Sequence, residues 1–303
     1  MKKRDIILIG FIVVLLLIIP FTSAGFFNDT WNKITGRVTS SPVTHNITVT
    51  SGSSPIVYDV MNETMTDVSS GPTEDSPTYV IINFSVSDGD GFGNLNDSTA
   101  TISFNFSGTS RTNTSCARYE GSDNIANYTC NVTIWWFDAP GTWSINASIS
   151  DTSSNYAENT TDTFYLGATD GFESSPSELT WGSIAPGAID VEPSEPILMN
   201  NTGNRERSIE VNATDLLGEE NSAQALWAAN FSAHTATNCG GTTMVADTYT
   251  AVSGATLPVG NYTVGGGTGQ EEIFICLEAA NAILDAQAYS TAARGTWMIK
   301  IVA

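Results

Sequence analysis

The fold is indicated by residues 79–106, which run YVIINFSVSDGDGFGNLNDSTATISFNF. Two segments of this stretch alternate between apolar and polar residues, and an Asp- and Gly-rich run separates them. Alternation with a period of two is typical of strands that bury one face, and Asp and Gly favour tight turns. The stretch therefore predicts two antiparallel strands with a short connection. Their apolar positions are Val80, Ile82, Phe84 and Val86, then Ala100, Ile102, Phe104 and Phe106.

The same pattern continues on both sides of this stretch. Further strands are predicted at residues 44–50, 111–119, 127–136, 143–149 and 156–166. About seven strands in ~125 residues is the number found in an immunoglobulin-like sandwich. The sequence therefore predicts an all-β chain whose first domain is an Ig-like β-sandwich over residues 44–166.

A polar linker and a second domain are predicted after the first. Residues 167–178, GATDGFESSPSE, carry the Gly, Ser and Pro typical of linkers. The strand pattern then resumes at residues 179–184, 197–201, 208–214, 225–232, 272–278 and 296–302, with a short helix expected at 279–288. We therefore expect a second β-sandwich over residues 179–303.

The N-terminus resembles an export signal. Residues 1–4 are cationic, residues 6–21 are apolar without a charge, and Thr22-Ser23-Ala24 supplies small residues, which predicts a signal peptide over residues 1–24. An uncleaved signal anchor is the alternative, because residues 6–27 are just long enough for a tilted span, and membrane attachment would then occur only through it. Both interpretations predict an extracellular or cell-surface protein, with residues 25–43 as an N-terminal tether.

The composition excludes one class of partner. The chain has 11 Lys and Arg against 32 Asp and Glu, a formal net charge of -21, and only 14% charged residues. Ordinary chains carry roughly 25% charged residues, so Lys and Arg are depleted here. A surface this negative repels phosphate backbones, and nucleic-acid binding is therefore not expected.

Four cysteines follow the signal, and no two form a C-x-x-C pair, which argues against a zinc ribbon or a redox site. Their spacing favours one disulfide in each domain. Of the three pairings that four cysteines allow, we expect Cys116–Cys130 and Cys239–Cys276.

Glycosylation sequons are the strongest signal. Fifteen of the 24 asparagines begin an Asn-x-Ser/Thr sequon, whereas about five or six would do so by chance at this Ser and Thr content. In the alternating strands, the sequon asparagines fall in the outward phase, as acceptors must. The fifteen candidate glycosylation sites are Asn28, Asn46, Asn62, Asn83, Asn96, Asn105, Asn113, Asn127, Asn131, Asn146, Asn159, Asn200, Asn212, Asn230 and Asn261.

Three stretches carry a family resemblance. They are residues 135–164, WWFDAPGTWSINASISDTSSNYAENTTDTF, residues 26–40, FFNDTWNKITGRVTS, and residues 179–204, LTWGSIAPGAIDVEPSEPILMNNTGN. Together with the strands and the Asp-Gly turn of residues 79–106, they resemble tandem Ig-like modules of archaeal secreted surface glycoproteins. The resemblance implies cell-envelope or filament architecture and N-glycosylation, and it implies no catalytic residues.

One loop is a candidate calcium site. Residues 88–97 place oxygen-bearing side chains at alternate positions, but Phe92 and Thr99 stand where an EF-hand needs ligands. In a seven-strand sandwich this loop should share an end with residues 151–155, so carboxylates from both loops could hold Ca²⁺. The alternative, which we favour, is that these residues only form tight turns. The candidate ligands are Asp88, Asp90, Asn94, Asp151 and Asn155.

No catalytic constellation is recognisable. The two histidines, His45 and His234, lie far apart without a nucleophile motif, and we expect no enzyme activity. The favoured function is a structural surface glycoprotein, S-layer-associated or part of a filament, whose partners are copies of itself or cell-envelope proteins. An adhesin or glycan-binding module is the alternative, with the outward Trp135 as its one aromatic candidate, although packing is favoured for this residue too. A secreted hydrolase is the least favoured class.

Overall fold

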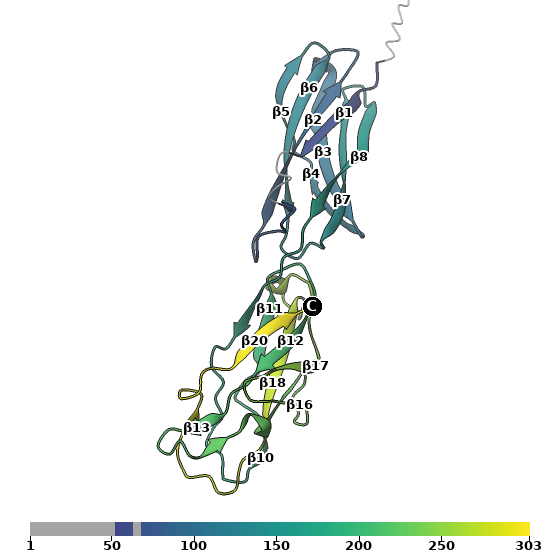
Figure 1. Ribbon diagram of the computed structural model, residues 1–303. Coiled ribbons are helices and arrows are strands. Elements are labelled where there is room, and N and C mark those ends of the chain that lie inside the picture. The colour runs from purple at the N-terminus through teal and green to yellow at the C-terminus, as the bar shows by residue number, and fades with distance from the viewer. Residues whose placement is uncertain (1–51, 63–67) are drawn as a thin grey trace, which may run out of the picture. The chain divides into compact units, whose positions relative to one another are not determined.

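The computed structural model describes residues 52–62 and 68–303, and Figure 1 traces their strands. The expected signal, tether and strand of residues 1–50, with Asn28, His45 and Asn46, lie outside these residues. The described secondary structure consists of strands and three short 3-10 helices, at Phe92–Asn94, Ala228–Asn230 and Tyr262–Val264. The all-β prediction is therefore confirmed.

No helix among the described residues has the length and hydrophobicity needed to cross a membrane.

The first sandwich consists of two antiparallel four-stranded sheets, ordered β1-β2-β6-β5 and β4-β3-β7-β8. Their strands are β1 Ile56–Asn62, β2 Thr78–Ser87, β3 Leu95–Phe106, β4 Thr109–Asn113, β5 Ala117–Ser122, β6 Ile125–Ile134, β7 Gly141–Asp151 and β8 Tyr156–Leu166.

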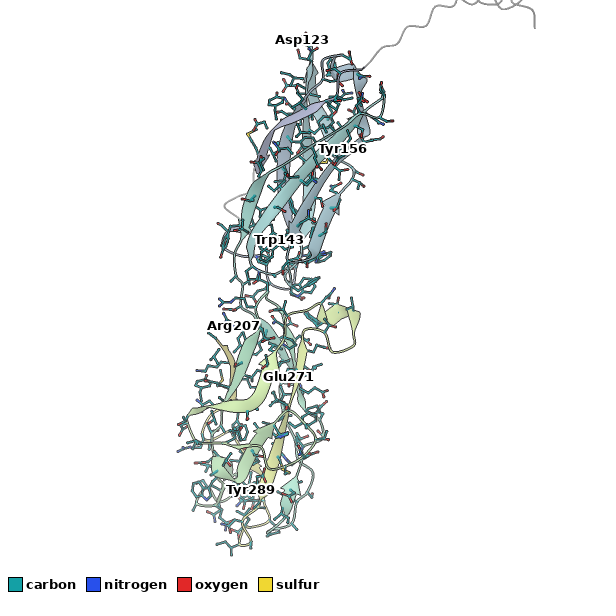
Figure 2. The ribbon with its side chains drawn as sticks, turned by 90° about the vertical axis from the view of Figure 1, so that its right-hand side faces the viewer. Asp123, Trp143, Tyr156, Arg207, Glu271 and Tyr289 are labelled. Carbon is teal, nitrogen blue, oxygen red and sulfur yellow. A yellow bond between two sulfur atoms is a disulfide. The ribbon has the colours of Figure 1, made fainter. Side chains whose placement is uncertain are left out.

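The alternating apolar residues of these strands form the first core. Successive strand residues face opposite sides of a sheet, so the apolar phase of β2, β3, β6 and β7 is buried almost completely. Trp143, labelled in Figure 2, is fully buried, contacts Phe106 and Phe164, and donates from Nε1 to Ala139 O at 3.1 Å. Trp136 is buried as well. Both tryptophans therefore serve packing, as their phase predicted.

The first sandwich differs from the prediction at two places. β1 was not predicted, because a bulge between Val57 and Asp59 interrupts its alternation where it pairs with β2. The strand predicted at residues 111–119 is instead two strands in different sheets. The chain leaves β4 after Asn113 and joins the other sheet as β5 at Ala117, and Cys116 lies between them.

Residues 172–302 form the second set of strands, which pack around a core of their own. One sheet has the order β16-β15-β18-β11-β9, with β10 also pairing with β18, and smaller sheets have the orders β17-β12-β20 and β14-β13-β19. The strands are β9 Phe172–Ser175, β10 Ile189–Val191, β11 Ile197–Asn201, β12 Arg207–Asn212, β13 Leu216–Gly218, β14 Ala225–Leu226, β15 Phe231–His234, β16 Thr242–Thr243, β17 Tyr249–Leu257, β18 Gln270–Ala279, β19 Tyr289–Ser290 and β20 Met298–Val302.

Sequence patterns were less reliable in this second part. Residues 179–184 are not a strand, although Leu179, Trp181 and Ile184 still pack on the core. The helix expected at 279–288 is absent from the described structure, where Ala279 ends β18 and turns follow. β17 was missed because Gly254, at φ 78°, lies beside a register shift that breaks the strand's alternation.

The predicted linker is more ordered than its composition indicated. Its residues 172–175 form β9, which pairs with β11, so regular structure resumes before residue 179. Ahead of β9, the buried Asn204 donates from Nδ2 to Gly167 O at 2.9 Å and accepts from Thr169 N at 2.7 Å. Arg207 makes a two-pronged ion pair with Asp170, with both hydrogen bonds at 2.7 Å. Residues 167–175 are therefore held by side chains of β12 and of the segment that precedes it.

Candidate functional site

Three candidate acceptors lie on the outer face of the β1-β2-β6-β5 sheet. Asn83 is on β2, and Asn127 and Asn131 are on β6. Residues paired directly across an antiparallel ladder share a face. Asn83 is paired with Thr129 and Ser85 with Asn127, so all three asparagines project from the side opposite the core.

The outer face of the other sheet carries three more acceptors, Asn96 and Asn105 on β3 and Asn146 on β7. Asn146 is paired with Ser103, and Asn105 with Ser144. Asn105 and Asn131 are exposed, and the other four are half-buried within their sheets. Each face of the first sandwich therefore bears three candidate glycan acceptors.

Several sequons are internally hydrogen-bonded. The sequon hydroxyl donates to the asparagine Oδ1 in the Asn96–Ser98, Asn159–Thr161 and Asn261–Thr263 pairs, at 2.7, 2.8 and 2.7 Å. This contact holds Oδ1 against the hydroxyl and fixes the orientation of the amide nitrogen that a glycan would modify. At Asn146, Oδ1 is buried while Nδ2 reaches the Glu158 carboxylate at 3.2 Å.

The remaining described acceptors are half-buried on strands and turns. Asn212 is on β12, in the phase opposite Ile209 and Val211, as predicted. Asn200, on β11, accepts from Gln270 Nε2 at 2.8 Å, and Asn230 accepts from the backbone nitrogen of Trp227 at 2.8 Å. The side chain of Asn62 lies outside the described residues.

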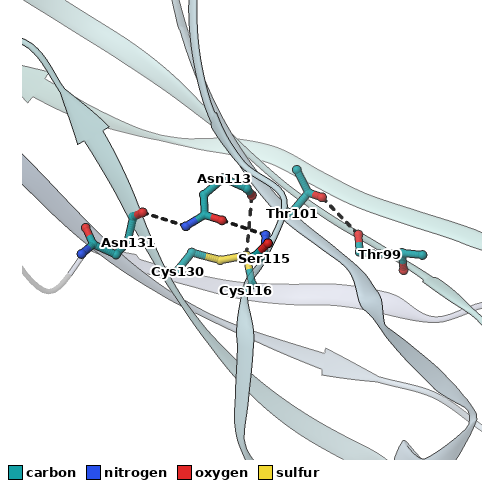
Figure 3. The surroundings of a disulfide bond; sticks show 7 residues. All are labelled: Thr99, Thr101, Asn113, Ser115, Cys116, Cys130 and Asn131. Carbon is teal, nitrogen blue, oxygen red and sulfur yellow. Dashed lines mark hydrogen bonds between the residues drawn. A yellow bond between two sulfur atoms is a disulfide. The ribbon is translucent and has the colours of Figure 1, made fainter.

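The Cys116–Cys130 disulfide adjoins two acceptors, as Figure 3 shows. Asn113 ends β4, accepts from Ser115 N at 2.7 Å, and donates from Nδ2 to Asn131 O at 2.8 Å. The disulfide bridges β6 and the residue before β5 within one sheet, with a Cα–Cα distance of 4.5 Å. The predicted pairing is confirmed, and the bridge fixes the backbone between both sequons.

The second predicted disulfide, Cys239–Cys276, is also confirmed, with a Cα–Cα distance of 5.4 Å. The carboxylates of Asp190 and Glu278 lie close to its sulfur atoms. Because disulfide sulfur is not a thiolate, this group lacks the sulfur ligands a metal would need. Glu278 instead accepts from Ser232 and from Gly240 N, which braces the loop that carries Cys239.

The candidate calcium ligands gather at one end of the first sandwich. The loop after β2 meets the loop after β7, and Thr152 N donates to Asn94 O at 2.8 Å. Asp88 and Asp151 are each only 1% exposed. Asn155 donates to Asp151 at 2.7 Å, whereas the Asp90 carboxylate accepts from Ser53 N. The structure thus brings four of the five predicted residues together, while the Asp90 carboxylate accepts from Ser53 N and lies, with the Asn155 amide, beside Gly52.

The Asn94 amide lies between the two buried carboxylates. Its Nδ2 donates to Asp88 at 3.3 Å and to Asp151 at 3.4 Å, while its Oδ1 accepts the Thr152 hydroxyl. A half-turn of the amide would exchange Oδ1 and Nδ2, and the Thr152 hydroxyl can donate or accept. Three oxygen atoms would then converge between the loops, a donor set that suits Ca²⁺. These three oxygens would supply part of the six to eight that Ca²⁺ takes, and Asp88 and Asp151 also accept backbone hydrogen bonds within their own loops, from Asp90, Ser153 and Asn155, as the favoured turn-forming interpretation expects.

The hydrogen bonds around Asp151 also stabilise its ionised form. Burial opposes ionisation, but donors from Asn155, Ser153 and Asn94 outweigh it and hold the pKa of the Asp151 carboxyl below its ordinary value. A lowered pKa contributes stability above the unfolded value, and this contribution is lost as the pH falls through the folded value. Asp151 therefore stabilises the loop that follows β7 at neutral pH, and it contacts the other loop through Asn94 at 3.4 Å.

Every cationic side chain among the described residues is paired with a carboxylate. The ion pairs are Arg111–Asp138, Arg118–Asp97, Arg205–Asp170, Arg207–Asp170, Arg294–Asp215, Arg294–Asp247 and Lys300–Glu210. None of these pairs involves Asp88 or Asp151. The surface of residues 52–62 and 68–303 therefore offers no uncommitted cation to an anionic ligand.

The aromatic and histidine candidates have packing roles. Trp135 is half-buried and stacks on Phe137, with ring centroids 6.0 Å apart, which agrees with packing. His234 accepts from Ala236 N at 3.0 Å at the end of β15. Among the tryptophans of the described residues, Trp227 is the most exposed, at 52%, and no sequence pattern distinguished it from the others.

No protein-family model matches the sequence, and no curated protein matches it. Among solved structures, the chain is similar to dimeric latent PorU from Porphyromonas gingivalis, at 8% identity and a TM-score of 0.26. This similarity covers 57% of the present chain and 15% of the PorU chain. A similarity this weak does not indicate a shared function.

Proposed function

We propose that this protein is a structural, non-catalytic glycoprotein of the cell surface, either associated with an S-layer or part of an extracellular filament. The observation that carries the proposal is the placement of three sequon asparagines on each outer face of the first sandwich. Two disulfides and the Lys- and Arg-poor composition agree with an extracellular site. The adhesin or glycan-binding module stays the second candidate, although its aromatic residue Trp135 is half-buried and stacks on Phe137.

Glycans on both faces would restrict how the protein assembles. Sheets that pack face to face lie about 10 Å apart, which leaves no room for a bulky glycan between them. Contacts with other copies or with envelope proteins would then use sandwich ends and strand edges. β8 is an 11-residue edge strand, and its outer edge is unpaired in the described structure. Edge addition along β8 is one assembly route that glycosylated faces would still permit.

Calcium would add to this architecture. The Asp88, Asn94 and Asp151 cluster lies at a sandwich end, where two loops meet. A bound Ca²⁺ would offset the repulsion between two buried carboxylates and tie the loops together. We propose this as a structural site of modest affinity, comparable to the sites of extracellular modules.

We expect protein from the native host to carry several N-glycans. Its intact mass should exceed the peptide mass by several glycans, and glycopeptide mapping should find Asn105 and Asn131 occupied because they are exposed. Electron microscopy of the same material should reveal ordered arrays or filaments. Unmodified Asn83, Asn105, Asn131 and Asn146 in native protein would rule out the surface-glycoprotein proposal. Bacterial expression tests nothing here, because it lacks the transferase.

Ca²⁺ should stabilise the first sandwich. With a Kd of roughly 0.1–1 mM, 10 mM Ca²⁺ would contribute about 1.4–2.7 kcal/mol, or several degrees in Tm. Scanning calorimetry in Ca²⁺ and in EDTA measures this shift. Mg²⁺ at the same concentration controls for general screening of the acidic surface, and Asp88→Asn should abolish the Ca²⁺-specific part. An equal rise with Mg²⁺, or a full Ca²⁺ response from Asp88→Asn, would refute the site.

A further inference from the structure

Large exposed apolar side chains are unevenly distributed over the first sandwich. The outer face of β1-β2-β6-β5 bears Met61, Tyr79 and Ile81, which are 46%, 56% and 38% exposed. On the β4-β3-β7-β8 sheet, the large apolar side chains exposed in the described structure are Tyr156, labelled in Figure 2, and Tyr165, both on the edge strand β8. We call Met61, Tyr79 and Ile81 the apolar acceptor patch.

The strand register interleaves this patch with two sequons. Met61 is paired with Asn83, and Ile81 is paired with Asn131. Tyr79 is paired with Thr133, the hydroxyl residue of the Asn131 sequon. Side chains paired in this way have Cβ atoms about 4.5–5.5 Å apart. A sugar attached to Asn83 or Asn131 would therefore begin directly beside exposed apolar surface.

The acceptors on the opposite face have polar neighbours. Asn105 is flanked by Ser110 and Ser144, and Asn146 is paired with Ser103. The hydroxyls there satisfy one another, since Ser103 lies 3.2 Å from the Ser110 oxygen and 2.9 Å from the Thr112 oxygen. Both faces thus carry asparagine acceptors, but the residues paired with these acceptors are apolar on one face and polar on the other. The two faces can therefore be compared within one domain.

A similar arrangement recurs in the second part of the chain. Asn212, on the central strand of β17-β12-β20, is paired with Tyr249 on one side and Met298 on the other. These two side chains are 39% and 51% exposed. Exposed apolar side chains therefore flank acceptor asparagines on two separate sheets.

We propose that the N-glycans on Asn83 and Asn131 lie along the apolar acceptor patch, so that their first sugars cover Met61, Tyr79 and Ile81 and stabilise this sheet. This inference rests on the proposed function, because it requires these asparagines to be glycosylated. Pyranose rings have an apolar C–H face, and burying that face against aromatic and aliphatic side chains removes apolar surface from water. Asn105 and Asn146 have no apolar side chain paired directly beside them, and the exposed Tyr156 lies across the Glu158 carboxylate from Asn146, so their glycans have little apolar surface to cover.

The negative charge of the chain favours an attached glycan over a second copy of the chain as the group that covers the apolar acceptor patch. Residues 52–303 carry 30 carboxylate side chains against six cationic ones, and all six cations are already paired. Two such surfaces repel each other at close range. A neutral sugar anchored within the patch meets no such repulsion, and its attachment removes most of the entropic cost of association.

The test compares two double variants made in a glycosylating host, Asn83→Gln/Asn131→Gln and Asn105→Gln/Asn146→Gln. Each removes two acceptors from one face. We expect the first to lower the Tm of the first sandwich by about 4 °C or more and to increase binding of a hydrophobic dye, and the second to change neither. Adding Met61→Thr, Tyr79→Thr and Ile81→Thr to the first variant should return dye binding to the wild-type level.

The outcomes of this test distinguish failure of the inference from failure of the proposed function. If mapping shows all four asparagines glycosylated in the wild type and the two variants behave alike, the inference is wrong while the proposed function stands. If mapping finds the four sites empty in native protein, the proposed function fails and the inference with it. A glycosylated wild type that sediments as a dimer, and that Tyr79→Thr dissociates, would assign the patch to a protein partner and overturn the inference. Should either Gln variant misfold, Thr133→Val removes the Asn131 glycan alone and must reproduce part of the shift.

Discussion

Replacing Cys239 and Cys276 together by alanine should lower the free energy of unfolding of the second sandwich by about 2–5 kcal/mol. The disulfide closes a loop with a sequence separation of 37, and it ties the segment before β16 to the core strand β18. Its removal increases the conformational entropy of the unfolded chain, which lowers the free energy of unfolding by ~4 kcal/mol in the chain-entropy model. Alanine is preferred to serine because Cys276 is buried, and a hydroxyl there would need a hydrogen-bond partner.

The other disulfide provides the matched control. Cys116 and Cys130 are only 14 residues apart, so their replacement by alanine should cost about 3 kcal/mol and affect the first sandwich. Calorimetry that resolves two unfolding transitions would assign each loss to its own domain. If the Cys239/Cys276 variant leaves its transition unchanged, or shifts that of the first sandwich, then the disulfide does not stabilise the domain in which it lies.

Replacing Arg111 by leucine should cost about 3–5 kcal/mol, the range for removing one member of a buried ion pair. The Asp138 side chain is only 1% exposed and accepts from Arg111 Nε at 2.9 Å and from Trp135 N at 2.8 Å. The Arg111 guanidinium also lies 5.7 Å from the Phe137 ring centroid. Without Arg111, the Asp138 carboxylate is left buried with no opposite charge.

Two further variants separate charge from geometry in this pair. Arg111→Lys keeps the charge but loses the two-pronged contact and should be intermediate in stability. Arg111→Leu/Asp138→Asn removes both charges and keeps an acceptor for Trp135 N, so it should recover part of the loss. Denaturant unfolding measures all three variants. An Arg111→Leu protein as stable as the wild type would mean that Asp138 is satisfied by its backbone donor and by water.

The candidate calcium ligands show which features of a loop can be predicted from its sequence and which cannot. The composition of residues 88–97 and 151–155 indicated oxygen ligands, and the expectation that neighbouring loops share a sandwich end placed them together. The sequence could not indicate that Asp90 would turn to Ser53 N, nor that Asn94 would bridge Asp88 and Asp151. Those outcomes depend on loop conformation, which short polar side chains determine only after the strands have packed.

The sequence by itself determined the fold class, the core of the first sandwich, both disulfide pairings and the outward phase of the sequon asparagines on β2, β3, β6, β7 and β12. Each of these follows from local periodicity or spacing, because a period of two assigns every strand residue to one face. β2, β6, β7 and residues 100–106 of β3 were predicted because their alternation is unbroken. β1 and β17 were missed because a bulge in one and a register shift in the other interrupt it.

Only the tertiary structure decided which residues face one another across the sheets. The alternating pattern predicts that Val80, Ile82 and Phe84 point inward. Nothing in the local sequence indicates that Met61 pairs with Asn83 or Ile81 with Asn131. Strand order and register depend on contacts between residues distant in sequence, and they are set by packing of the whole core. For this reason the sequence could locate the acceptors on outer faces, while the apolar surface beside two of them emerged only from the folded chain.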